Sequence, residues 1–123
     1  MSTASNNDIT SVMALTASVS SQAVTCPFQL NPYGRGVKLF VTATQASAGS
    51  FTVTLQGLFN GAVYTILASA AISATGTTVL TVYPGLTAVA NATANDVLPR
   101  QWQVTITPTA FTGVLNIGAC VIV

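Results

Sequence analysis

The chain has 123 residues, of which three are basic, two are acidic and none is histidine. Catalysis at neutral pH usually relies on His, Glu, Asp, Lys or Cys side chains, so this composition argues against an enzyme. Charged residues make up 4% of the chain, against roughly 25% in typical soluble domains, and this leaves little electrostatic protection against self-association. We therefore expect partners to cover much of the surface, in an oligomer or a larger assembly.

The N-terminal part of the chain mixes polar and β-branched residues. Met1–Asn7 is small and polar and predicts a flexible arm, followed by a single β domain over residues 8–123. Between Asp8 and Ser21 the β-branched and hydroxyl residues favour a strand, with a short helix as the alternative. Cys26–Gly34 contains Pro and Gly residues that are typical of turns.

Clear strand patterns follow in the middle of the chain. Val37–Ala43 and Phe51–Gln56 alternate apolar and polar residues, a period of two that predicts strands with one buried face. Asn60–Gly61 predicts a type I′ hairpin turn, because both residues tolerate a positive φ. This turn would join the second strand to a return strand over Val63–Ala70.

The C-terminal half contains three more strand patterns and one long break. Thr77–Tyr83 predicts a strand that ends at a Pro-Gly pair, and Leu86–Pro99 predicts an ordered loop or a short helical turn. Gln101–Ile106 alternates again, whereas Val114–Val123 is apolar on both faces, so we expect it at the centre of a sheet or against a neighbouring chain. Seven to eight short strands separated by turns predict an all-β, antiparallel β-sandwich (jelly-roll-like) or a small barrel, with little helix.

The sequence offers no set of residues for a cofactor, a metal or a nucleic acid. Zinc usually requires four Cys or His ligands at characteristic spacings, the glycines match no nucleotide-binding motif, and three cations are too few for a nucleic-acid footprint. No stretch reaches the 20 or so apolar residues of a membrane helix, and no signal peptide is evident. In that context we expect Cys26 and Cys120 to be reduced, buried thiols, although one disulfide would be compatible with the count.

Candidate contact residues lie in and around the long break. Tyr83 and Leu86 flank the Pro-Gly turn at its start, and Asp96 and Arg100 flank a Pro shortly before Trp102. Arg and Trp are enriched at interface hot spots, but a local ion pair between Asp96 and Arg100 is an equally good interpretation. Arg35, between two glycines, is expected to be a solvated turn residue.

Several stretches resemble a known class of proteins. Tyr64–Leu67, Gly76–Leu86 (GTTVLTVYPGL) and Asn95–Trp102 (NDVLPRQW) resemble small β-rich structural proteins encoded near the capsid genes of tailed bacteriophages, and the similarity runs from about Tyr33 to Thr107. The chain departs from that class at Gly57–Val63, where the relatives have a longer, more charged hairpin tip.

The resemblance implies a virion protein without catalytic residues. Its expected role is a capsid decoration (cement) protein, made in the host cytoplasm, that forms a homotrimer on the capsid surface and bridges subunits of the major capsid protein. The alternatives are another virion component, such as a head fibre base, neck or tail protein, or a carbohydrate- or receptor-binding module. For the last of these, only Asn95, Asp96 and Trp102 supply the usual polar and aromatic groups.

Overall fold

The computed structural model describes residues 9–15, 23–25, 29–30 and 34–122, and within them the chain is all-β, as predicted, with no helix. The described strands form one sheet. They are β1 (Ile9–Leu15), β2 (Val24–Thr25), β3 (Gln29–Leu30), β4 (Gly36–Phe59), β5 (Ala62–Ala68), β6 (Gly76–Val82), β7 (Thr93–Ala94) and β8 (Gln101–Ile122). No described segment is a helix long and apolar enough to cross a membrane.

Two long strands organise the sheet. β4 and β8 pair antiparallel along almost their whole length, from Gly36 opposite Ile122 to Gly57 opposite Trp102. β6 and then β7 continue the sheet beside the first half of β4, and β5 lies beside its second half. On the far side of β8, β1 pairs with its C-terminal half, and β2 and β3 pair with its N-terminal half.

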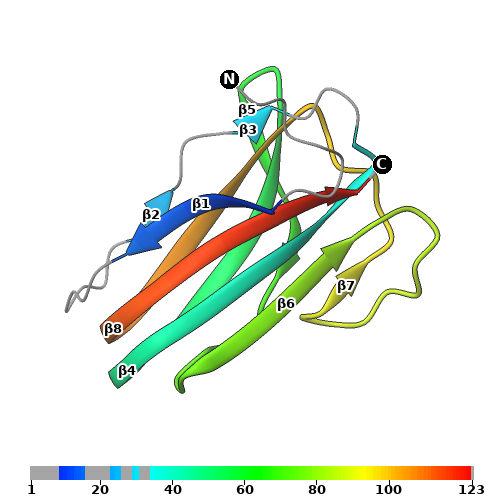
Figure 1. The fold of residues 1–123 in the computed structure, drawn as a ribbon. Helices are drawn as coiled ribbons and strands as arrows, with labels where there is room; N and C mark the ends of the chain where they lie inside the picture. The colour runs from blue at the N-terminus through cyan, green and yellow to red at the C-terminus, as the bar shows by residue number, and fades with distance from the viewer. Residues whose placement is uncertain (1–8, 16–22, 26–28, 31–33, 123) are drawn as a thin grey trace.

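Both long strands bend sharply near their middles, so that the sheet curls into a half-barrel (Figure 1). The pairing shifts register three times between Ala43 and Ser50, and such bulges bend a strand without ending it. Gly49 and Ala110 lie opposite each other in this corner with positive φ angles of 72° and 50°. The sequence predicted separate strands on either side of each corner, because its Ser, Gly and Pro residues are typical of turns.

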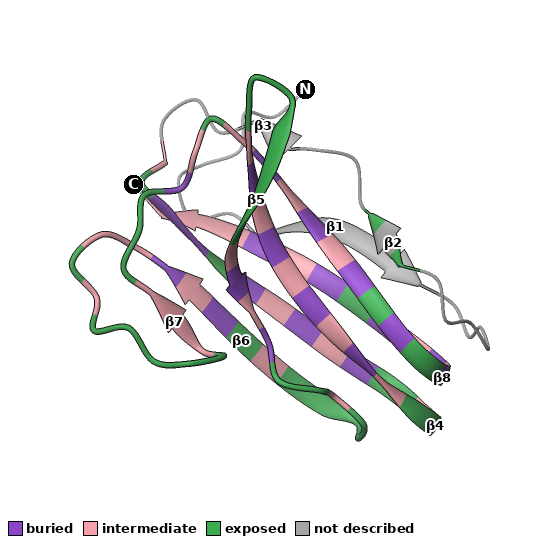
Figure 2. Ribbon diagram, turned by 180° about the vertical axis from the view of Figure 1, so that it is seen from behind, coloured by how far each residue is buried: buried purple, intermediate pink, exposed green. Residues whose placement is uncertain are grey.

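The core lies inside the curl. Along β4 and β8 buried residues alternate with half-buried ones (Figure 2), as the period of two predicted. The largest fully buried side chains come from both halves of each long strand and from β6: Phe51, Phe111, Leu39, Leu55, Leu80, Ile106, Leu115, Ile117, Val37, Val41, Val53 and Val82. The bend therefore lets the two halves of one sheet enclose a single apolar core.

Most local predictions agree with the structure, although Gln29–Leu30, inside the predicted turn region Cys26–Gly34, forms the short strand β3. Asn60 and Gly61 form the turn between β4 and β5 with φ angles of 51° and 80°, as a type I′ turn requires. β1 confirms the preference for a strand after Asp8, and β8 places the doubly apolar C-terminal segment at the centre of the sheet. The predicted arm, Met1–Asn7, lies outside the described residues.

Candidate interaction surface

The described part of the chain contains no cluster of three or more His, Cys, Asp or Glu side chains. Cys120 is half-buried on β8, and Cys26 lies outside the described residues, so the state of the two thiols remains a prediction. A shallow, open depression lined by Ala71–Thr78 contains only small and hydroxyl side chains apart from Ile72. Apart from the exposed Arg35, Lys38, Asp96 and Arg100, the described side chains offer apolar contact and neutral hydrogen bonding.

Tyr83 and Leu86 lie where the chain leaves β6 and begins the long loop. The amide of Tyr83 donates to the carbonyl of Ala94 (3.2 Å), and the amide of Gly85 donates to Oδ1 of Asn95 (2.8 Å). Tyr83 and Leu86 are each half-buried. The loop predicted over Leu86–Pro99 is thus ordered by its own hydrogen bonds and contributes β7, a parallel partner for β6, instead of a helical turn.

Asp96 and Arg100 are exposed and lie on either side of the buried Leu98. Leu98 is 3% exposed, and its amide donates to the carbonyl of Arg35 (2.8 Å). Oδ1 of Asp96 accepts a hydrogen bond from the amide of Val97 (2.7 Å). No ion pair between Asp96 and Arg100 occurs among the described residues, so both charged groups are presented to solvent.

Trp102 is a core residue, only 2% exposed, and therefore presents almost no surface to a partner. The alternation of β8 directs it inward together with Val104 and Ile106. It lies opposite Gly57, which in turn lies opposite Tyr64 on β5. A Cβ atom at position 57 would collide with the ring of Tyr64 and approach Cγ of Pro99 to 2.8 Å, so the missing side chain makes room for Tyr64 and Pro99.

The hairpin between β4 and β5 exposes apolar side chains that we did not predict as contacts. Phe59 is 71% exposed, Val63 49% and Tyr64 42%, and the hairpin tip projects beyond the rest of the sheet (Figure 2). We call the segment Phe59–Tyr64 the hairpin tip. The sequence contained a signal for this exposed surface. Large apolar residues flank the Asn-Gly turn on both sides, and no charged residue lies next to them.

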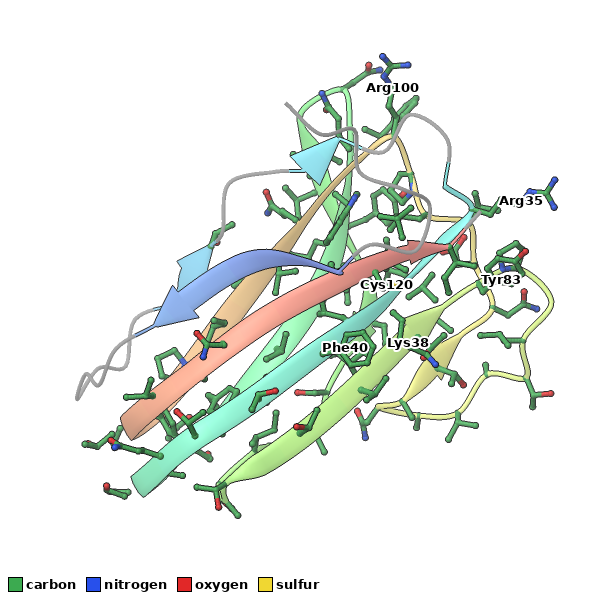
Figure 3. The ribbon with its side chains drawn as sticks, viewed as in Figure 1. Arg35, Lys38, Phe40, Tyr83, Arg100 and Cys120 are labelled. Atoms are coloured by element: carbon green, nitrogen blue, oxygen red, sulfur yellow. The ribbon has the colours of Figure 1, made fainter. Side chains whose placement is uncertain are left out.

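Among the charged residues that the structure describes, Arg100 lies at the same end of the sheet as the hairpin tip (Figure 3), two residues before Trp102, which pairs with Gly57. Between Leu39 and Asn95 the chain contains no charged residue. Arg35 lies close to the segment before β8, because its carbonyl accepts the hydrogen bond from Leu98. Figure 3 shows Arg35 and Arg100 extending outward and Lys38 beside Phe40 on β4, with Arg100 well apart from Tyr83. The five predicted contact residues therefore do not form one site.

Neutral hydrogen bonds cover the outer face of the second half of β4. Oε1 of Gln56 accepts from Nε2 of Gln103 (2.9 Å) and from Oγ1 of Thr105 (2.8 Å). Oγ1 of Thr105 in turn lies 3.1 Å from Oγ1 of Thr25 on β2. This network joins three strands and satisfies polar groups on an outer face without any charged side chain.

Comparison with known proteins gave no match to a family model, to a curated protein or to a solved structure.

Proposed function

We propose that this chain is a structural protein of a phage virion, without catalytic activity. It is a capsid decoration protein of jelly-roll-like β-sandwich type that forms a homotrimer on the head surface and bridges subunits of the major capsid protein. The resemblance of Gly76–Leu86 and Asn95–Trp102 to β-rich proteins encoded near phage capsid genes supports this role. Bridging a shell requires a large complementary contact area, and it requires no catalytic residue.

The observation that carries the proposal is the nearly uncharged surface with an exposed apolar hairpin tip. No charge occurs from Leu39 to Asn95, and Phe59 within this span is 71% exposed. Contiguous exposed apolar patches usually mark a surface that binds another protein, and Val63 and Tyr64 of the same hairpin tip are also exposed. An assembled shell offers the same binding surface many times, so contacts repeated on every subunit stabilise the whole particle by mass action.

The copy number of the protein in purified virions, relative to the major capsid protein, tests the location. A decoration protein is expected in numbers comparable to the major capsid protein. A count close to that of a single vertex or tail structure would contradict decoration and favour a neck, tail or fibre-base component.

Heating decorated and undecorated heads tests the stabilising role. We expect decorated heads to release DNA at a higher temperature, because the protein binds the assembled shell and shifts its equilibrium. This difference should change little with salt, since screening weakens contacts between exposed charges and has little effect on buried apolar area. Equal melting of the two kinds of head would refute the cement role.

A pair of matched variants tests the hairpin tip itself. Phe59→Ser removes an apolar group that is 71% exposed, and Val89→Ser removes one that is 52% exposed in the long loop. Neither side chain belongs to the core, so both variants should fold. We expect Phe59→Ser to reduce binding to undecorated heads at least about tenfold, which corresponds to a loss of about 1.4 kcal/mol, and Val89→Ser to bind normally.

A further inference from the structure

The outer edge of β5 is an unpaired strand edge in the described structure. β5 pairs with β4 and with no other described strand. Four consecutive residues at its start, Ala62–Thr65, are exposed. A free strand edge presents unpaired N–H and C=O groups to which another chain can pair.

The hairpin turn determines which backbone groups point outward. In a hairpin with a two-residue turn, the residues next to the turn, here Phe59 and Ala62, form a hydrogen-bonded pair, and the pairs then alternate. Tyr64, opposite Gly57, is therefore bonded to β4, whereas Val63 and Thr65 direct their N–H and C=O groups away from β4. The free edge therefore presents the N–H and C=O groups of Val63 on one side of Tyr64 and those of Thr65 on the other.

The exposed start of this edge lacks the residue types that usually prevent strand pairing, and the register shift of the β4–β5 pair lies beyond Thr65. Natural edge strands are commonly protected by Lys, Pro or inward-pointing charges, and β5 contains none of these residues. A two-fold contact brings each surface against its own copy, and β5 has no charged residue that could repel its counterpart. The uncharged edge can therefore pair with its own copy through backbone hydrogen bonds.

We propose that the β5 edge pairs antiparallel with the β5 edge of a second copy, about a two-fold axis through Tyr64. In this arrangement Val63 of each copy lies opposite Thr65 of the other, and both residues supply the outward groups that a hydrogen-bonded pair requires. The two Tyr64 residues then face each other as a non-hydrogen-bonded pair, with Cα atoms about 4.5 Å apart. This contact is distinct from that of a trimer, whose interfaces join two different surfaces.

The contact is small and too weak to hold two free copies together. We therefore expect it to form between copies that are already held close to each other. An aromatic side chain presents about 150–250 Å², and Tyr64 and Val63 expose 42% and 49% of their surfaces. Such an edge falls well below the roughly 1,200 Å² of a stable interface. Pairing becomes populated at high concentration or where many copies share one surface, because both raise the effective concentration of the second edge.

Disulfide trapping of the full chain tests this pairing directly. Tyr64→Cys places two thiols on Cα atoms about 4.5 Å apart, within the range that a disulfide spans. Val63→Cys is the matched control, since its side chain is similarly exposed, but its two copies lie about 7–8 Å apart along the diagonal, at or beyond the limit for a disulfide. We expect linkage between two copies of position 64 to be about tenfold faster, as identified by peptide mass spectrometry.

A second variant separates pairing from folding. Val63→Pro removes an N–H group that points away from β4, so the hairpin should keep its own hydrogen bonds while the linkage in Tyr64→Cys falls about tenfold. The thermal unfolding temperature of the Val63→Pro variant shows whether the protein still folds. Equal linkage at positions 63 and 64, or linkage at position 64 that Val63→Pro leaves unchanged, would overturn the proposal. A third result would also overturn the proposal: Val63→Pro reduces binding to heads, while Tyr64→Cys shows no linkage at position 64. The β5 edge would then bind a different chain.

Discussion

The rings of Phe51 and Phe111 meet edge to face next to the corner of the curled sheet, with centroids 4.7 Å apart and planes inclined by 68°. Phe51 belongs to β4 and Phe111 to β8, and both are almost completely buried. Each residue follows the segment where its strand bends. The pair therefore fills the space that opens where the two long strands change direction, and it holds the two halves of the half-barrel at a fixed separation.

Phe111→Ala should be among the most destabilising substitutions in the chain. Removing a buried Phe costs about 3–5 kcal/mol through lost transfer free energy and the cavity that remains, and here the edge-to-face contact is lost as well. Phe111→Leu keeps most of the volume and should cost less than half as much. Denaturant unfolding of the two variants measures the difference, and equal losses would contradict the prediction by showing that the cavity costs nothing beyond the loss of the ring contact.

Gly57→Ala should destabilise the fold through its neighbours on the inner face. The added methyl group would collide with the ring of Tyr64 and approach Pro99, and overpacking of this kind typically costs about 1–3 kcal/mol. In a double-mutant cycle with Tyr64→Ala, the cost of Gly57→Ala should fall by about 1 kcal/mol or more. Strictly additive effects would contradict the close approach of Tyr64 to Gly57.

Ser69→Ala should remove a buried hydrogen bond at the end of β5. The amide of Val53 donates to Oγ of Ser69 (2.9 Å), which donates in turn to the carbonyl of Ala70 (2.8 Å), and Ser69 is 5% exposed. Without Oγ the amide of Val53 has lost this acceptor inside the protein, at a cost of about 1–3 kcal/mol. Ser73→Ala, at an exposed position in the following loop, should leave the free energy of unfolding unchanged within about 0.5 kcal/mol.

The purified protein should be an oligomer, with a trimer as the expected state. The reason is the nearly uncharged surface, which a separate monomer would expose to water with little electrostatic repulsion between copies. Light scattering at micromolar concentration measures the mass directly. A monomer of 12.5 kDa would contradict the prediction.

The sequence alone determined the class of the fold and its local turns. Alternation along Val37–Ala43 and Phe51–Gln56 indicated strands with one buried face, and Asn60–Gly61 indicated the hairpin, because both signals depend on backbone geometry and on residues a few positions apart. The apolar C-terminal segment indicated a central strand for the same reason. These features need only local interactions and the separation of apolar from polar side chains.

Only the tertiary structure decided how these strands continue and which side chains remain exposed. The turn-like residues around Gly49 and Ala110 bend β4 and β8 without ending them, because each strand is paired with the other through the corner. The same pairing buries Trp102 opposite Gly57 and leaves Phe59 exposed at the hairpin tip. Pairing between residues from 45 (Gly57 with Trp102) to 86 (Gly36 with Ile122) positions apart determines both outcomes, and a local pattern of residue types contains no information on such distant contacts.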